Sequence, residues 1–233
     1  MLVNSNSICV PSQLTAKALA KLQVKSFFLN YPVKDRIKPG VLPRCLSNNI
    51  TFGIFGTFSV RKGQDVLIDS LINLPFEILE KAKFIFCGSI LDEVIYRKVI
   101  SFKDILINNC IVMEQIENES AYYQLFENID FLICPSRDDS FPLVVIDALM
   151  FGVPVLISNR VGLSDLIVSG DNGFVFPSGD INTLSNLLKF IISHRNEINY
   201  GRMSDSSRKL FLNNFDFLGS IDNIVELSKK MRL

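Results

Sequence analysis

Short apolar runs recur along this chain, and segments with helical spacing separate them. The runs are apolar almost throughout, as in Phe-Ile-Phe-Cys-Gly at 84–88. Strands of this kind alternating with helices are typical of a parallel sheet covered by helices on both faces. We therefore predict an α/β fold, a doubly wound parallel sheet over about residues 49–212. Its strands are expected at 51–55, 83–87, 111–113, 131–134, 153–158 and 174–176, and its helices at 65–74, 91–101, 120–127, 143–151, 181–194 and 215–231.

The first part of the chain has a different pattern. A strand at 8–10, a helix at 13–22 capped by Ser12 and a strand at 26–29 are expected there. Residues 31–49 follow; they are polar, have no clear period and contain three prolines and a glycine. This composition is typical of a linker.

Composition excludes several classes of protein. The 24 basic and 24 acidic residues balance, so the chain lacks the basic surface of a nucleic-acid-binding protein. Hydrophobic residues make up 48%, which excludes intrinsic disorder. The single histidine, His194, leaves almost no room for a Ser-His-Asp triad or a His-rich metal centre. We expect it to be structural, near the end of a helix where a cation suits the helix dipole.

The cysteines and the apolar stretches indicate where in the cell the protein is located. The five cysteines are an odd number and form no CxxC pair, which argues against a disulfide framework or a zinc site and favours a reducing cytosol. No stretch reaches the roughly 18 to 20 apolar residues of a spanning helix, and the first residues lack a signal-peptide pattern. We expect a cytoplasmic protein, with peripheral contact at the inner face of the cell membrane at most.

Ligands of doubly wound sheets bind beyond the carboxyl ends of the strands, so the loops there are the candidate sites. The first, 56–63, places Arg61 and Lys62 where a helix begins and where free N–H groups suit a phosphate. Its spacing matches neither a Walker A loop nor GxGxxG. A solvated basic turn is the alternative.

The second loop, 135–142, precedes a very apolar helix. Asp147 is the only polar residue in 143–151, and burying it without a partner would cost several kcal/mol. It must therefore accept from a backbone N–H, a basic side chain or a ligand hydroxyl; a satisfied structural aspartate is the alternative. The neighbours Asp138 and Asp139 suggest a metal site only weakly, since such pairs are usually solvated. A third loop, 161–165, is an anion or hydroxyl site or a plain helix cap.

Together these loops resemble glycosyltransferase family 4, whose members have the two-domain GT-B fold. The matching features, in order, are Lys62-Gly63, the strand ending at Gly88, Pro135-Ser136, Asp139 and Asp147 separated by seven residues, Ala148 before Gly-Val-Pro-Val at 152–155, and Asn172-Gly173. The resemblance covers residues 50 to about 232. It implies that the predicted sheet is the Rossmann-like, C-terminal half of a GT-B enzyme.

The resemblance also implies a donor-binding site. Lys62 would bind the donor diphosphate, with Arg61 or the backbone of Gly56 and Thr57 helping. Asp139 would face the sugar hydroxyls, and Lys62 and Asp139 would be the catalytic residues. Asp147 would hold the ribose hydroxyls, and Gly88, Ser89 and residues 113–116 would border the base. Backbone N–H groups of 141–144 would touch the phosphates. The full predicted set is Gly56, Thr57, Arg61, Lys62, Gly88, Ser89, Glu114, Ile116, Asp139, Ser140, Phe141, Pro142, Leu143, Val144 and Asp147. No metal or other cofactor is expected, since Lys62 and N–H groups supply the positive charge that a departing diphosphate needs.

Several positions depart from the family pattern. Both motif glutamates are aspartates here, Asp139 and Asp147, whose side chains are shorter by one methylene. The Gly-Gly-x-x-Glu loop is 161–165 in this chain, with a valine at the first glycine position and Asp165 at the acid. Glu114 stands where glycine is common. Shorter acids require either closer packing of the helix on the nucleotide or weaker binding.

The resemblance suggests the following organisation. Residues 1–33 are the end of an N-terminal acceptor domain, 34–48 the interdomain linker, 49–212 the nucleotide-sugar-binding domain and 213–233 a C-terminal crossing helix. The chain would then be a truncated or split retaining glycosyltransferase. It would transfer a sugar from a nucleotide-diphosphate donor to a glycan or lipid-linked acceptor, in cell-surface polysaccharide or lipopolysaccharide synthesis. A separate acceptor-domain chain would be its partner.

Three alternatives remain open at this stage. The chain could be a non-catalytic nucleotide-sugar-binding module, a different GT-B enzyme such as a nucleotide-sugar epimerase, or an inactive relic. The Lys-Gly loop and the spacing of Asp139 and Asp147 argue against the epimerase.

Overall fold

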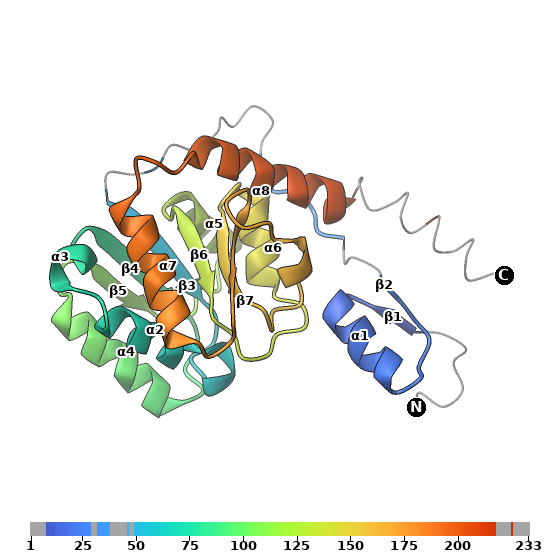
Figure 1. Ribbon diagram of the computed structural model, residues 1–233, viewed down its shortest axis with the longest axis horizontal. Helices are drawn as coiled ribbons and strands as arrows, with labels where there is room; N and C mark the ends of the chain where they lie inside the picture. Colours follow the sequence, from blue (N-terminus) through green and yellow to red (C-terminus); the bar gives the residue numbers. More distant parts are fainter. Residues whose placement is uncertain (1–7, 29–31, 38–45, 47–48, 218–224, 226–233) are drawn as a thin grey trace.

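The computed structural model describes residues 8–28, 32–37, 46, 49–217 and 225, and its main body is one six-stranded sheet with helices on both faces (Figure 1). All strands of this sheet are parallel. They are β3 (Ile50–Phe55), β4 (Ala82–Cys87), β5 (Cys110–Met113), β6 (Phe131–Cys134), β7 (Val155–Ser158) and β8 (Gly173–Phe176). The predicted doubly wound α/β sheet is confirmed.

The strand order explains where a ligand can bind. Across the sheet the strands run β5-β4-β3-β6-β7-β8, so the chain moves outward from β3 in one direction and then returns to build outward from β6 in the other. This is the strand order of dinucleotide-binding folds, and a crevice opens where the direction reverses. The loops that follow β3 and β6 are therefore neighbours, although about 80 residues separate them in the sequence.

Two separate cores hold the helices on the sheet. One face is covered by α2 (Gln64–Ile72), α4 (Glu93–Ile105) and α7 (Ile181–Ser193), which pack on Phe52, Phe84 and Phe86. The other is covered by α5 (Glu119–Glu127), α6 (Leu143–Met150) and α8 (Tyr200–Asn214), which pack in one core with Phe55, Leu132 and the C-cap of α8, Phe215. A short α3 (Phe76–Leu79) and two 3-10 turns, η1 (Val60–Lys62) and η2 (Ser164–Leu166), complete this body.

The start of the described chain forms a unit of its own beside the main sheet (Figure 1). It consists of β1 (Ile8–Val10), α1 (Gln13–Lys21) and β2 (Ser26–Phe28), with β1 and β2 parallel. The predicted cap is present, because Ser12 Oγ accepts from Thr15 N at 3.2 Å. An ion pair of 2.9 Å between Lys17 and Asp165 joins this unit to the loop after β7.

Residues 32–37, from the predicted linker region, lie on the main body. Val33 N donates to Phe215 O at 2.7 Å. Asp35 pairs with Arg208 of α8, and Arg36 pairs with Glu119 of α5 at 2.6 Å. This segment therefore spans the ends of α5 and α8.

Most predicted elements are present with bounds shifted by a few residues. The sequence analysis did not predict the short α3, nor α8, which carries the main body past residue 212. Most of the tail helix predicted at 215–231 lies outside the described residues. His194 is the C-cap of α7, and its ring stacks on Phe190 with the centroids 5.0 Å apart, which agrees with a structural role.

The start of α4 offers a simple test of local stability. Asp92 Oδ1 accepts from Val94 N at 3.0 Å and from Ile95 N at 3.3 Å, and its own N–H donates to Phe58 O. We expect Asp92→Ala to lower the free energy of unfolding by about 1 kcal/mol, since the cap bonds are lost. Urea unfolding measures this. The exposed Asp104 near the other end of α4 is the control, and an equal loss in Asp104→Ala would contradict the capping role.

Candidate functional site

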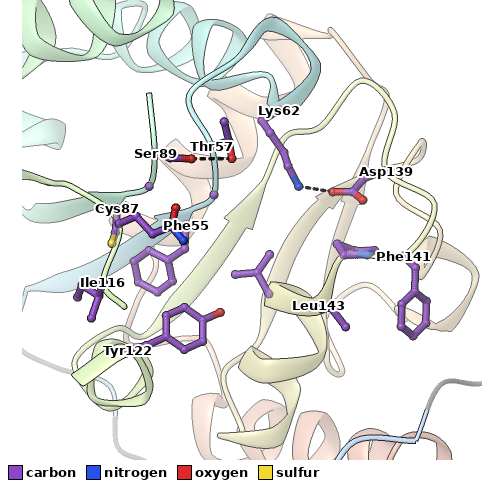
Figure 2. Close-up of a pocket in the computed structure, with 15 residues that line it drawn as sticks. Phe55, Thr57, Lys62, Cys87, Ser89, Ile116, Tyr122, Asp139, Phe141 and Leu143 are labelled. Carbon is purple, nitrogen blue, oxygen red and sulfur yellow. Dashed lines mark hydrogen bonds and ion pairs between the residues drawn. The ribbon is translucent and has the colours of Figure 1, made fainter. Parts of the chain in front are cut away.

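A pocket of about 390 Å³ opens at the carboxyl ends of β3, β4 and β6, where the strand order reverses (Figure 2). Its walls come from the loops after β3, β4, β5 and β6 and from the first turns of α5 and α6. The lining residues are Phe55, Gly56, Thr57, Lys62, Cys87, Gly88, Ser89, Gln115, Ile116, Tyr122, Asp139, Phe141, Pro142, Leu143 and Val144. Eleven of the fifteen residues predicted from the sequence are in this set.

The loop after β3 is shaped by glycine. Gly63 has a φ of +72°, and a Cβ at this position would lie 2.1 Å from Pro135 O. Only glycine allows the two loops to approach this closely. Gly88 is similar, since a Cβ there would lie 2.0 Å from Gly56 O. The contact at Gly63 gives the Lys-Gly pair of the sequence a physical role, since it brings the β3 and β6 loops together. The contact at Gly88 brings the β3 and β4 loops together.

Lys62 and Asp139 meet across this junction. Lys62 Nζ lies 2.6 Å from Asp139 Oδ2, and the two side chains are 18% and 10% exposed (Figure 2). The backbone of Asp139 is fixed separately, since its C=O accepts from Gly162 N at 2.7 Å. The two predicted catalytic residues therefore lie side by side, as a half-buried ion pair at the pocket wall.

Arginines also join the two loops. Arg137 forms a bidentate pair with Asp65 of α2, with N···O distances of 2.7 and 2.6 Å, and Asp65 raises the pKa of the guanidinium. Arg61 is exposed and donates to Asp138 O at 3.1 Å, and it does not line the pocket. Arg61 was predicted to help bind the diphosphate; in the structure it joins the two loops instead, and Arg137, which the sequence analysis did not single out, contributes to the same junction.

The amino end of α6 faces the pocket. Its N-cap, Pro142, has no side chain that could accept from the first turn. The N–H groups that begin a helix have no partner within the helix and carry partial positive charge. Among the described residues, no acceptor is found for the N–H groups of Leu143 and Val144. They can therefore donate to an anion beside Lys62.

The opposite wall is less charged. Ser89 Oγ and Thr57 Oγ1 lie 3.0 Å apart, and Gln115 and Ile116 close the side next to β5. Cys87 Sγ lies 3.2 Å from Glu114 O, and burial raises the pKa of this thiol. Glu114 and Ser140 were predicted in the site, but both are exposed and neither lines the pocket.

Asp147 lies behind the pocket wall. It is 9% exposed and is not among the lining residues. Its partner is the hydroxyl of Tyr122 on α5, which donates to Asp147 Oδ2 at 2.8 Å. Burial raises the pKa of the Asp147 carboxyl to about 6, against the lowering effects of Tyr122 and Arg36. The expected donor is therefore present but is none of the protein groups proposed from the sequence.

Within the described ranges there is no group of three or more His, Cys, Asp or Glu side chains that could hold a metal ion. No helix among the described residues is long and apolar enough to cross a membrane.

The family of the chain follows from comparison with known proteins. Residues 46–210 match the family described as glycosyl transferases group 1, and this segment includes every residue that lines the pocket. The chain belongs to this family. The match fits the resemblance seen in the sequence at the level of the GT-B glycosyltransferases.

Several curated relatives are glycosyltransferases, and some come from capsule loci. An uncharacterized glycosyltransferase of Methanocaldococcus jannaschii is 27% identical over 61% of this chain and 38% of its own length. The capsular polysaccharide biosynthesis glycosyltransferase CapM of Staphylococcus aureus is 25% identical over 64% of this chain and 38% of its own length. The chain spans less than half the length of the curated relatives that it matches.

Solved structures support the same fold. Anabaena HepE in complex with UDP has a TM-score of 0.78, with 19% identity over 97% of this chain and 64% of that one. The sucrose-phosphate synthase of Thermosynechococcus elongatus has a TM-score of 0.78 with 17% identity over 99% of this chain and 59% of that one. At these identities the likeness concerns the fold, a Rossmann-like domain of a GT-B glycosyltransferase.

Proposed function

We propose that this chain is the donor-binding part of a retaining, family 4 type glycosyltransferase. Its pocket binds a nucleotide-diphosphate sugar, and the sugar passes to a glycan or lipid-linked acceptor in cell-surface polysaccharide or lipopolysaccharide synthesis. The observation that carries the proposal is the meeting of Lys62, Asp139 and the free amino end of α6 at one side of the pocket. Relatives in capsular polysaccharide synthesis and neighbours solved with UDP support it.

The chemistry follows from the charges at this wall. During transfer, the bond between the anomeric carbon and the diphosphate oxygen breaks, and the electron pair stays on the diphosphate. The acceptor oxygen bonds to the anomeric carbon, and the acceptor's proton passes to the departing diphosphate. Lys62 and the N–H groups of Leu143 and Val144 stabilise this negative charge because they are already in place. Asp139, beside Lys62, faces the sugar hydroxyls. In this proposal the donor pocket needs no metal, since the protein supplies the positive charge.

The remaining predicted roles are assigned by position. Ile116 lines the side of the pocket away from Lys62, and Ser89 lies beside Thr57 (Figure 2). We assign these two residues to the nucleoside. Residues 8–28 form a separate unit beside the loop that contains Asp165, and we assign this unit to the acceptor side. We place the activity in the cytoplasm, since the thiols of Cys87, Cys110 and Cys134 are free and buried, as suits a reducing compartment.

The direct test is a thermal-shift measurement of the chain with UDP, GDP and ADP and the matching sugar nucleotides. A ligand that binds only the folded state stabilises it by about 2.7 kcal/mol at a hundredfold excess over Kd. We expect one base to give the largest shift and its monophosphate, which lacks the second phosphate, to give a smaller one. No shift with any of them, on a cooperatively folded chain, would overturn the proposal. Binding without transfer to any acceptor would favour a non-catalytic binding module.

A further inference from the structure

Tyr122 lies between Asp147 and the pocket. The tyrosine side chain lines the pocket, whereas Asp147 does not. The phenol oxygen bonds to Asp147 Oδ2 at 2.8 Å. In Figure 2, Tyr122 lies on the same side as Phe55 and Ile116, away from the ion pair of Lys62 and Asp139. A ligand that fills the pocket therefore meets the tyrosine before it meets the carboxylate.

The hydrogen bond determines what the tyrosine can do for a ligand. A phenol has one proton to donate and two lone pairs to accept with. Its proton is committed to Asp147, a carboxylate that can only accept when it is ionised. The lone pairs of the phenol oxygen remain for the pocket. This position is thus an acceptor that suits a ligand hydroxyl and not a phosphate oxygen.

We propose that Tyr122 is the residue that accepts from a ribose hydroxyl of the donor, and that Asp147 acts through Tyr122 by fixing its phenol oxygen. The proposal rests on the proposed function and deepens it. It also replaces the direct role predicted for Asp147. Because the aspartate side chain is short, the tyrosine extends its reach into the pocket.

The ring of Tyr122 is held in place independently of its hydroxyl. It packs edge-on against Phe126, with the ring centroids 5.3 Å apart, and Phe126 is fully buried. Tyr122→Phe keeps this packing and removes only the oxygen. The variant thus separates the hydroxyl from the ring.

The electrostatic surroundings keep the phenol protonated. Burial and the Asp147 carboxylate both raise the pKa of Tyr122, so its proton stays on the pair at every working pH. The other titratable or charged groups near the pair are Arg36 from residues 32–37, Tyr123 and Glu119 on α5, and Cys87 on β4. Since the pKa of Asp147 is raised to about 6, the carboxylate is ionised and the phenol oriented above that pH. We therefore expect affinity for a ribose-containing ligand to fall below pH 6.

The test is calorimetric titration of the full chain with UDP, GDP and ADP, followed by the 2′,3′-dideoxy form of the nucleotide that binds best. We expect Tyr122→Phe to weaken binding of the ribose form by about tenfold, because one hydrogen bond is lost. The affinity for the dideoxy form should be nearly unchanged. Tyr123→Phe is the matched control and should bind as the parent does, since Tyr123 does not line the pocket.

A double variant separates the two roles. If Asp147 acts through the phenol, Tyr122→Phe with Asp147→Ala should bind no more weakly than Tyr122→Phe alone. This variant also removes the buried carboxylate that Tyr122→Phe leaves without its donor, so it remains informative if the single variant folds poorly. Losses that add would mean that Asp147 contacts the ligand directly, which would overturn the inference.

The two proposals fail in different ways. A folded parent that binds none of the three nucleotides overturns the proposed function and this inference with it. A parent that binds, together with a Tyr122→Phe variant of equal affinity and equal preference for ribose, overturns the inference alone.

Discussion

Lys62→Ala is expected to weaken binding of the preferred nucleoside diphosphate by about a hundredfold, because a charge-assisted contact to the diphosphate is lost. Lys62 is held by one aspartate, Asp139, at the edge of the pocket, and the amino end of α6 lies on the same wall. Helix N–H groups alone supply only partial charge. Calorimetric titration of the parent and the variant measures the difference.

The ion pair between Lys62 and Asp139 predicts that removing the aspartate has the opposite effect on the affinity for a nucleoside diphosphate. In the structure Lys62 is already paired, so a diphosphate must compete with Asp139 for the ammonium group. Asp139→Asn removes the competitor and leaves Lys62 in place. We expect this variant to bind the nucleoside diphosphate at least as tightly as the parent, and to bind the sugar nucleotide more weakly, since its contact to the sugar hydroxyls changes.

Loss of the ion pair also affects folding, which must be separated from binding. Lys62→Ala leaves the Asp139 carboxylate, whose side chain is 10% exposed, without its partner, at a cost of roughly 2 kcal/mol. Lys98→Ala is the matched control, because Lys98 pairs with Asp69 at 2.6 Å outside the pocket lining. Equal binding by folded Lys62→Ala and the parent would show that Lys62 does not hold the diphosphate.

The sheet could be predicted from the sequence because the same pattern, an apolar run followed by a helical segment, recurs along the chain. Each strand is apolar at most of its positions, and burial on both faces of a parallel sheet favours that pattern. Helix α8 was missed for the opposite reason. Its buried positions include Met203, Ser207 and Phe211, spaced four apart, but the serine makes the apolar stripe discontinuous. Packing on α6 and the sheet, which no local pattern records, stabilises this helix.

The site was predictable where strand order alone determines it. Lys62 and Asp139 come together because β3 and β6 are neighbours at the point where the strand order reverses, and the loops that follow them must meet. The roles of the arginines were not predictable in this way. Arg61 and Arg137 are both close to the junction, and only the three-dimensional structure assigns Arg137 to Asp65 and Arg61 to a backbone carbonyl.

Tyr122 illustrates what the sequence could not supply. The sequence analysis established that Asp147 needs a donor, because a buried carboxylate is unfavourable. The donor comes from α5, 25 residues earlier, and only its spacing from Phe126 marks Tyr122 as a residue on the covered side of that helix. Which residue of α5 faces α6 depends on how the two helices pack, and local periodicity does not determine that.

The raised pKa of Asp147 predicts that its carboxylate destabilises the folded chain at neutral pH. Since its pKa is raised from 3.8 to about 6, the folded chain holds this proton more tightly than the unfolded chain does. The parent therefore loses stability as the pH rises from about 4 to about 6 and does not regain it at higher pH. Asp147→Asn removes the carboxylate, and its amide oxygen can still accept from Tyr122. We expect this variant to be more stable than the parent by roughly 2 kcal/mol at pH 7.5.

The pH dependence of the stability difference shows whether the charge of Asp147 causes it. Below about pH 4 the carboxyl is protonated in both the folded and unfolded parent, so the advantage of Asp147→Asn should vanish there. Urea unfolding at several pH values measures the difference, and Asp104→Asn, an exposed aspartate on α4, is the control that should show none. An advantage of the same size at every pH would mean that packing, and not the charge, sets the stability at this position. The buried carboxylate of Asp147 would then destabilise the fold while it orients Tyr122. That combination supports a role for the two residues in binding.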